Sequence, residues 1–266
     1  MIPPSRSASL AGKVALITGS SRGIGAAIAG ELACHGARIV LHGRDRAALS
    51  ATRASIEAAL PDRAGDEPQI LTVTGDVTSA ADLAAMRTTI EAQLGAVDIL
   101  VANAGGNPVP PMPVDQLPED VWRRTIDGNL TATFLTVQCF LPAMKARGSG
   151  AILTISSAAA RRAHAGSPIA YAAAKAGIEM FTQDVAKQMG RFGIRANCIA
   201  PETILTEDND KQIPDDLKTK LAAEHPIARL GVPRDVAHAA RFLCSDEAGW
   251  ITGIVLDVAG GAVMSR

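Results

Sequence analysis

Short apolar runs alternate along the chain with segments whose apolar residues recur every three or four positions. The runs have the length and composition of buried strands, and they cover residues 14–18, 38–42, 70–74, 97–102, 151–156, 194–200 and 254–258. In the first intervening segment, Ile24, Ile28 and Leu32 lie at helical spacing. This alternation predicts an α/β fold, with a parallel sheet and helices on both of its faces.

The remaining helical patterns are equally regular. Helices are predicted over residues 23–35, 46–60, 80–94, 119–127, 130–147, 170–191 and 233–244. Residues 105–118 include five prolines and are predicted to form a loop. Residues 202–226 are polar and rich in aspartate, without a strand pattern, which is a composition typical of a mobile loop.

The composition fits one large domain. The chain has 266 residues, of which 47% are hydrophobic, and this supports a sizeable core. No composition shift or linker divides it, so we expect a single domain over residues 10–266. Residues 1–9 lack the apolar run of a signal peptide and are expected to form a flexible tail.

Charge and cysteine content limit the possible partners and compartment. The net charge of −1 gives no reason to expect nucleic-acid or membrane binding. The four cysteines are scattered without a CxxC pair, so we interpret them as buried thiols rather than metal ligands or disulfides. We therefore expect a cytoplasmic protein with no bound metal.

A glycine-rich turn follows the first predicted strand. Residues 18–25 read TGSSRGIG and lead directly into the first predicted helix. Glycines at such a turn allow close backbone approach to a pyrophosphate, and the start of the helix offers free N–H groups. The strand–turn–helix context therefore predicts a dinucleotide site.

The end of the second predicted strand bears on which dinucleotide is bound. Gly43 stands where a carboxylate would contact the ribose of NAD, and Arg44 follows it. Arg44 and Arg22 together suit a 2′-phosphate, although Asp45 is placed to neutralise Arg44. We therefore predict NADP(H) in preference to NAD(H), with a solvated Arg44 as the alternative.

Tyr171 is the only tyrosine, and Lys175 follows it four positions later. The three alanines between them favour a helix, on which positions i and i+4 share a face. A nearby ammonium favours the phenolate form of a tyrosine, so the pair suits proton transfer near neutral pH. Taken alone, the pattern is also that of an ordinary surface pair.

Taken in order, these motifs resemble the short-chain dehydrogenase/reductase family over nearly the whole chain. Besides the glycine turn and the Tyr171–Lys175 pair, the matching pieces are Asp76-Val77, Asn103-Ala104-Gly105, Asn129, Ser156-Ser157, the 201–206 segment and Ile251-Thr252-Gly253. The sequence is most similar to the 3-oxoacyl-[acyl-carrier-protein] reductase type. The resemblance implies one Rossmann-like, doubly wound sheet of seven parallel strands.

The resemblance also implies roles for four catalytic residues. Tyr171 would exchange a proton with the substrate oxygen, and Lys175 would hold the nicotinamide ribose. Ser157, rather than Ser156, would orient the substrate oxygen. Asn129, at a helix start, would support a water in a proton relay to Lys175.

Further residues would contact the cofactor. By resemblance, Asp76 and Val77 would meet the adenine, and Asn103, Ala104 and Gly105 would line the cofactor channel. The Ile204 backbone and the Thr206 hydroxyl would meet the nicotinamide carboxamide. The resemblance also implies that residues 202–226 cover the substrate as a mobile lid. The complete expected cofactor set is Gly19, Ser21, Arg22, Gly23, Ile24, Gly25, Arg44, Asp76, Val77, Asn103, Ala104, Gly105, Tyr171, Lys175, Ile204 and Thr206.

Two positions depart from the family pattern. Glu202 replaces the usual glycine after Pro201, and we expect its side chain to face solvent rather than the nicotinamide. The interval from Ser157 to Tyr171 is about one residue longer than usual, near residues 161–164. Arg161 and Arg162 are expected to be solvated, with reception of an anionic substrate or a carrier protein as the alternative. His164 is expected to have no catalytic role.

The sequence therefore predicts an enzyme that reduces a ketone with NADPH, with 3-oxoacyl thioesters among the candidate substrates. One alternative is a secondary-alcohol dehydrogenase that uses NAD(P)+, and another is a dinucleotide-binding protein without catalysis. A small-molecule substrate is expected. By resemblance, so is a homotetramer formed through the helices at 130–147 and 170–191 and the C-terminal run at 253–264.

Overall fold

The computed structural model describes residues 10–60, 69–107, 109–163 and 168–264. The expected N-terminal tail, residues 1–9, and His164 lie outside these ranges.

Seven parallel strands form one sheet, in the order β3-β2-β1-β4-β5-β6-β7. All seven predicted strands are present, to within two residues at their ends. They are β1 (Val14–Ile17), β2 (Arg38–Gly43), β3 (Ile70–Thr74), β4 (Ile99–Ala102), β5 (Gly150–Ile155), β6 (Ile194–Pro201) and β7 (Val255–Val258). The predicted fold class is therefore confirmed.

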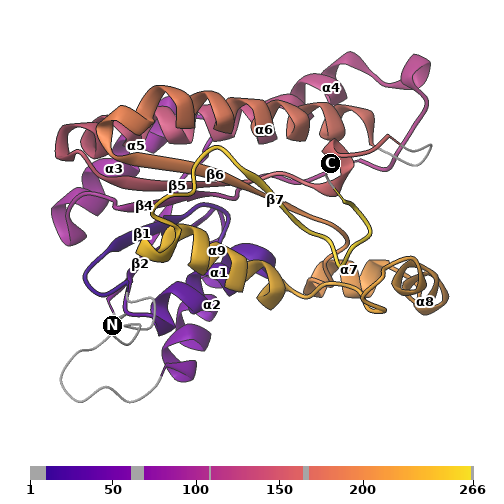
Figure 1. Ribbon diagram of the computed structural model, residues 1–266, viewed down its shortest axis with the longest axis horizontal. Coiled ribbons are helices and arrows are strands. Elements are labelled where there is room, and N and C mark those ends of the chain that lie inside the picture. Colours follow the sequence, from indigo (N-terminus) through magenta and orange to yellow (C-terminus); the bar gives the residue numbers. More distant parts are fainter. Residues whose placement is uncertain (1–9, 61–68, 108, 164–167, 265–266) are drawn as a thin grey trace.

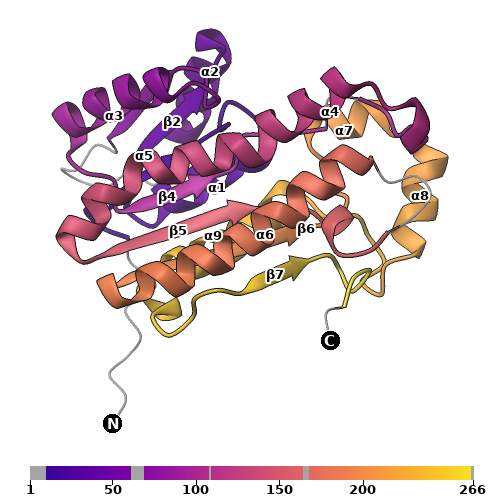
Figure 2. The ribbon, with the colours of Figure 1, turned by 90° about the horizontal axis from the view of Figure 1, so that it is seen from above.

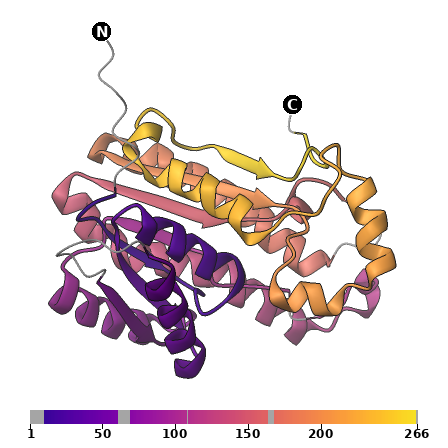
Figure 3. The same ribbon diagram turned by 90° about the horizontal axis from the view of Figure 1, so that it is seen from below.

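Helices cover both faces of the sheet (Figure 1). One layer contains α3 (Ala80–Leu94), α5 (Ala132–Arg147) and α6 (Ile169–Met189), seen from above in Figure 2. The other contains α1 (Gly23–Cys34), α2 (Arg46–Ala59) and α9 (Pro233–Cys244), seen in Figure 3. Burial on both faces explains why the strands are continuous apolar runs.

The core is accordingly split into two clusters by the sheet. In β1, Ala15 and Ile17 belong to the cluster under α1 and α9, whereas Val14 and Leu16 belong to the cluster under α3 and α5. Successive strand residues point to opposite faces, so one short strand contributes to both clusters.

The helices at 119–127 and 130–147 differ from the prediction. Rather than two separated helices, α4 (Glu119–Ile126) continues through a π-helical turn, η2 (Asp127–Thr131), into α5. Asn129 therefore lies inside a continuous helical stretch and not at a helix start, because the widened turn absorbs the residues that the sequence pattern suggested as a break.

The predicted lid contains two short helices that the sequence pattern did not indicate. These are α7 (Glu207–Gln212) and α8 (Asp215–Ala223), and neither has a buried residue. Without a buried face they carry no apolar stripe, which is the signal that sequence periodicity detects. Both lie beyond the carboxyl ends of the strands (Figures 1 and 3).

The sheet reverses its winding between β1 and β4. β1 pairs with β2 on one side and with β4 on the other, and all of these pairings are parallel. In open parallel sheets, ligands bind outside the carboxyl ends of the strands at such a reversal. This edge is where the predicted site residues should meet.

Candidate active site

The glycine turn joins β1 to α1 as predicted. Gly19 and Gly23 have φ of 66° and 57°, a left-handed conformation that favours glycine. A Cβ on Gly25 would collide with the Gly19 carbonyl oxygen and lie 2.6 Å from the Asn103 amide nitrogen. The backbone is therefore packed too closely here for any larger residue.

The start of α1 fits an anionic group. Arg22 is the N-cap residue, and its side chain makes no capping hydrogen bond to the first turn. Backbone N–H groups at an uncapped helix start attract anions, and the helix dipole adds to the attraction. The turn thus fits the pyrophosphate of a dinucleotide.

Asn103 secures the turn to the end of β4. Its side-chain amide donates hydrogen bonds of 2.9 Å to the Thr18 carbonyl and 3.0 Å to the Gly19 carbonyl. In return, the Thr18 hydroxyl accepts the backbone N–H groups of Asn103 and Ala104 at 3.0 and 3.1 Å. The two strands at the reversal of the sheet are thereby tied together.

The end of β2 brings Arg44 beside this turn. Among the described residues, Asp45 forms no ion pair with Arg44; its Oδ1 caps α2 by accepting the N–H groups of Ala47 and Ala48 at 2.9 and 3.2 Å. The exposed Arg44 keeps its charge available. Asp76, after β3, accepts two hydrogen bonds of 2.8 Å from Thr78, which lower the pKa of its carboxyl group.

His42 joins the same region, and the sequence analysis did not identify it. Its Nδ1 accepts the Gly19 N–H at 3.2 Å, and its Nε2 lies 3.1 Å from the Gly75 carbonyl. An acceptor Nδ1 and a donor Nε2 define one neutral tautomer. Burial lowers the pKa of His42, which favours that neutral form. The ring therefore connects the glycine turn to the residue that precedes Asp76.

Tyr171 and Lys175 converge on α6 as predicted. The Lys175 Nζ lies 5.3 Å from the centre of the Tyr171 ring. Lys175 is only 4% exposed, and its Nζ donates a hydrogen bond of 2.8 Å to the Ile155 carbonyl at the end of β5. A buried ammonium thus lies between the tyrosine and the carboxyl edge of the sheet.

The two candidate serines after β5 have different surroundings. Ser156 is buried, and its hydroxyl donates to Glu179 at 2.8 Å and lies 3.1 Å from the Lys175 carbonyl. The half-buried Ser157 hydroxyl accepts the Ala159 N–H at 3.2 Å and thereby caps η3 (Ala158–Ala160). Of the two, only Ser157 keeps its own hydroxyl proton available for another group.

Asn129 lies buried in the π-helical turn. Its amide nitrogen donates to the carbonyls of Thr125 and Gly106, both at 2.9 Å, and its amide oxygen accepts the Gly106 N–H at 3.0 Å. Asn129 thus fixes the loop that follows Gly105. π-Helical turns of this kind are frequent at functional sites.

The start of the lid contacts the glycine turn. Thr206 caps α7 by accepting the Asn209 N–H at 3.3 Å, and a Cβ on Gly23 would lie 3.2 Å from the Thr206 methyl group. Arg22 forms an exposed ion pair of 3.4 Å with Asp208 of α7. Ile204 is buried, and its carbonyl accepts the Asn209 amide at 2.8 Å.

Glu202 does not face solvent, and that expectation is wrong. Its carboxylate accepts the Thr203 N–H and lies 3.2 Å from Nε2 of His225, at the end of the lid. The side chains of His225 and Glu202 are 4% and 17% exposed. The carboxylate therefore joins the two ends of the lid. The sequence did not predict this contact, because His225 is 23 positions away from Glu202.

The cysteines are only partly as expected. Cys198 and Cys244 are buried, and burial raises the pKa of their thiols to about 11 and about 12. Cys34, however, is exposed at the end of α1, so the expectation of burial is wrong there.

Within the described ranges, His, Cys, Asp and Glu form no group of three or more that could hold a metal ion. No described helix is long and apolar enough to cross a membrane.

Comparison with known proteins places this architecture among characterised enzymes. The family model described as enoyl-(acyl carrier protein) reductase matches residues 19–263. The 7α-hydroxysteroid dehydrogenase of Escherichia coli is 38% identical over 96% of this chain and 95% of its own length. The 3-oxoacyl-[acyl-carrier-protein] reductase FabG of Escherichia coli is 36% identical over 95% of this chain and 98% of its own.

Solved structures agree closely with the fold. A short-chain type dehydrogenase/reductase from Mycobacterium ulcerans has a TM-score of 0.88 and 31% identity, covering 96% of this chain and 90% of its own. A 7α-hydroxysteroid dehydrogenase complexed with NADH and 7-oxoglycochenodeoxycholic acid has a TM-score of 0.88 and 36% identity, covering 97% and 96% of the two chains. The sequence motifs, the parallel sheet and these matches agree, and the chain belongs to the short-chain dehydrogenase/reductase family of NAD(P)(H)-dependent oxidoreductases.

Proposed function

We propose that this protein reduces a ketone to a secondary alcohol with NADPH, with Tyr171 as the proton donor. The observation that carries the proposal is the buried Lys175 ammonium, 5.3 Å from the centre of the Tyr171 ring. An ammonium this close stabilises negative charge as the phenol gives up its proton. Loss of ketone-dependent NADPH oxidation in Tyr171→Phe tests the proposal.

Each catalytic group has a separate task in this mechanism. Bound NADPH supplies a hydride to the carbonyl carbon. Tyr171 gives its phenolic proton to the carbonyl oxygen, and Ser157 donates a hydrogen bond to the same oxygen. Donors aimed in advance at the oxygen where charge develops stabilise the transition state. Asn129 supports the water that returns a proton toward Lys175.

The groups that would hold the cofactor lie along the carboxyl edge of the sheet. We propose that the uncapped start of α1 binds the pyrophosphate and that Lys175 binds the nicotinamide ribose. Asp76 and Val77 would meet the adenine, and Asn103–Gly105 would line the channel. Ile204 and Thr206, where the lid starts beside Gly23, would meet the carboxamide.

We infer that NADP(H) is preferred over NAD(H) through Arg44 and Arg22. Support comes from the exposed Arg44 guanidinium beside the turn and from the use of Asp45 as a helix cap. Removing one charge-assisted bond to the 2′-phosphate should cost about 1.5–3 kcal/mol, or roughly 10- to 100-fold in affinity. Arg44→Ala should therefore weaken NADPH binding by that factor and leave NADH binding unchanged.

The matched control for this experiment is Arg46→Ala, which removes an exposed arginine two positions further, on α2. Titration of both cofactors against the parent and the two variants measures the six affinities. Equal loss of NADPH affinity in both variants, or a parent that prefers NADH, would contradict the assignment.

The second candidate function is oxidation of a secondary alcohol with NAD(P)+. It is favoured by the related 7α-hydroxysteroid dehydrogenase, whose structure is a complex with NADH and 7-oxoglycochenodeoxycholic acid. The same residues serve both directions, because Tyr171 accepts in oxidation the proton that it donates in reduction. Initial rates in both directions with one substrate pair would separate the two.

The substrate would lie among the loops around residues 106–117, 158–169 and 202–225, of which 108 and 164–167 lie outside the described residues. 3-Oxoacyl thioesters belong in the first panel of substrates. The residues at 202–226 would act as its lid.

We also propose a cytoplasmic homotetramer. Exposed Phe134 on α5 and Met180 on α6 support self-association, because they are 42% and 59% exposed. A monomer mass in light scattering would exclude the tetramer.

A further inference from the structure

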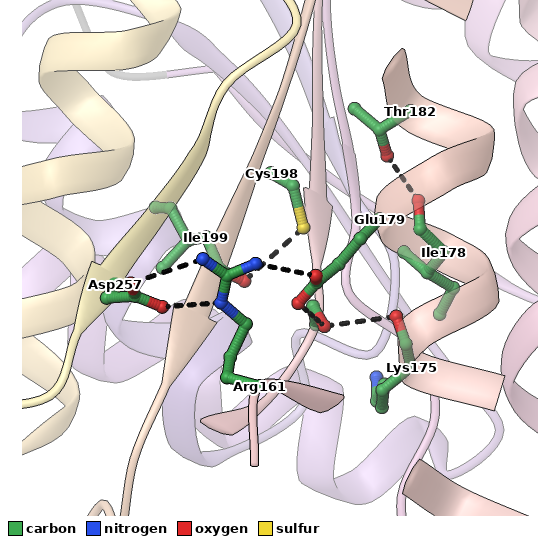
Figure 4. Close-up of polar contacts among 9 residues, drawn as sticks. Arg161, Lys175, Ile178, Glu179, Thr182, Cys198, Ile199 and Asp257 are labelled. Atoms are coloured by element: carbon green, nitrogen blue, oxygen red, sulfur yellow. Dashed lines mark hydrogen bonds and ion pairs between the residues drawn. The ribbon is translucent and has the colours of Figure 1, made fainter. Parts of the chain in front are cut away.

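Arg161 is turned into the protein, although it lies in the loop that was expected to be solvated. It follows η3 directly, four residues after Ser157. Its guanidinium lies between two carboxylates, with Nη1 3.0 Å from Glu179 and Nε 3.1 Å from Asp257 (Figure 4). The side chains of Arg161, Glu179 and Asp257 are 21%, 12% and 10% exposed. The guanidinium is therefore already occupied by internal partners.

Glu179 connects this arginine to the catalytic helix. It lies on α6, four positions after Lys175 and eight after Tyr171, and so on the same helix face. While Oε2 of Glu179 binds Arg161, its Oε1 accepts the Ser156 hydroxyl at 2.8 Å. One carboxylate thus holds both ends of the segment 156–161.

Ser157 lies inside the segment that is held in this way. The Ser156 hydroxyl also lies 3.1 Å from the Lys175 carbonyl, so the segment is joined to the backbone of α6 as well. Asp257 on β7 holds the opposite side of Arg161. The position of Ser157 relative to Tyr171 and Lys175 is therefore set by contacts that converge on Glu179.

We propose that Arg161 is a positioning residue, which acts through Glu179 to hold Ser157 in register with Tyr171 and Lys175. This inference rests on the proposed function, since it assigns Ser157 to the substrate oxygen. Its competitor is the role considered from sequence, in which Arg161 receives an anionic substrate. The two differ in a measurable way, because a positioning residue affects neutral and anionic ketones equally.

The charge balance explains why arginine is needed at this position. Among the described residues, Arg161 is the only cation paired with either Glu179 or Asp257. Without it, two largely buried carboxylates would face one another, and like charges repel strongly where water is scarce. A planar guanidinium binds both carboxylates at once, which the single ammonium of a lysine does poorly.

The experiment compares Arg161→Ala with Arg162→Ala. Arg162 is the matched control, because it is the next residue of the same loop and is exposed, with one hydrogen bond of 3.3 Å to the Ala262 carbonyl. Misplacement of a catalytic group by about 1 Å can cost on the order of 100-fold in rate. Arg161→Ala should therefore lower kcat about 10- to 100-fold on a neutral ketone and on its carboxylate analogue alike, with the KM for NADPH unchanged.

Rescue experiments separate positioning from general destabilisation. Guanidinium chloride at millimolar concentration, with sodium chloride as the ionic-strength control, should restore part of kcat in Arg161→Ala only. Arg161→Lys should be intermediate. Amide hydrogen exchange of residues 157–163 should accelerate in Arg161→Ala and not in Arg162→Ala, and this readout requires no substrate.

Several outcomes would overturn the proposal. Loss confined to the carboxylate-bearing ketone would make Arg161 a substrate receptor, and equal kinetics and exchange in both variants would remove any positioning role. If Arg161→Ala does not fold, Ser156→Ala and Arg161→Lys carry the same comparison, and unchanged kcat in both would contradict it. Failure of the proposed function would be recognised separately with Tyr171→Phe. If the proposed function is wrong, this variant retains full activity, regardless of the results with the Arg161 variants.

Discussion

We expect His42 to make the region around the glycine turn sensitive to acid. In the neutral tautomer it accepts from the Gly19 N–H and faces the Gly75 carbonyl with its other nitrogen. Burial lowers the pKa of His42 below 6.5, with the Asp76 charge opposing and the Arg44 charge assisting the shift. A proton on Nδ1 would abolish the acceptor that holds the glycine turn.

The direction of the pH effect follows from linkage. Below pH 6.5 the unfolded chain takes up a proton at His42 that the folded chain resists. The stabilising contribution of the neutral ring is therefore complete above this value and is lost as pH falls through it toward the lower pKa of the folded state. We expect the free energy of unfolding of the parent to fall between about pH 7 and pH 5.

His42→Asn should reduce this pH dependence. The substitution removes the titrating ring and should cost about 1–3 kcal/mol at pH 7.5, because it breaks two partly buried hydrogen bonds. Urea unfolding at several pH values measures both effects. His238→Asn, at an exposed position of α9, is the control and should keep the parental pH dependence. Identical pH profiles for parent and His42→Asn would contradict the account.

At the scale of single residues, the sequence predicted the contacts between residues that are close together in the chain. Tyr171 and Lys175 are four positions apart, so helix geometry alone predicts that they meet. The partners of Arg161 are 18 and 96 positions away, and the two contacts of His42 are 23 and 33 positions away. No local period brings such residues together, which explains why neither role could be predicted.

At the scale of elements, Glu202 closes the lid segment on itself. Glu202 follows β6 and His225 follows α8, so α7 and α8 lie between them in the sequence. In the structure the two side chains are 3.2 Å apart. Neither α7 nor α8 has a buried residue. The arrangement of the lid therefore depends on polar contacts such as this one rather than on a core of its own.

Glu202→Gln should loosen the lid. Loss of a charge-assisted hydrogen bond costs about 1.5–3 kcal/mol, so the open population should rise roughly 10-fold or more. We expect faster proteolytic cleavage within residues 207–224 and a higher KM for the ketone. Glu224→Gln is the matched control, because Glu224 is exposed and adjacent to His225. Equal cleavage rates in the two variants would show that Glu202 does not restrain the lid.

Predictability differs between elements for a physical reason. The five inner strands were found because they are almost completely buried on both faces and so appear as apolar runs. The edge strands β3 and β7 are only partly buried, but their residues are still mostly apolar. The π-helical turn at Asp127–Thr131 leaves no such mark, since it changes the hydrogen-bond pattern without breaking the helix. The lid helices were missed because both are short and neither has a buried face.

At the scale of the whole molecule, the sheet brings distant segments to one edge. The glycine turn, the end of β4, the serines after β5, the lid after β6 and the start of α6 all lie at the carboxyl ends of the parallel strands. A doubly wound sheet places ligands at this edge because the helices and loops on either side of the reversal diverge there. The fold thus brings the candidate site residues together at one edge of the sheet.

The most direct test of the central claim is NADPH oxidation against a panel of ketones, including a 3-oxoacyl thioester, with parent and Tyr171→Phe. One positioned acid is typically worth ~10²–10⁴-fold in rate, so the variant should lose that much kcat on the best substrate. NADPH affinity, measured separately, should be unchanged. A variant that keeps parental activity, or a parent that binds NADPH and oxidises it with no ketone, would contradict the assignment of Tyr171 as the proton donor of a ketone reductase.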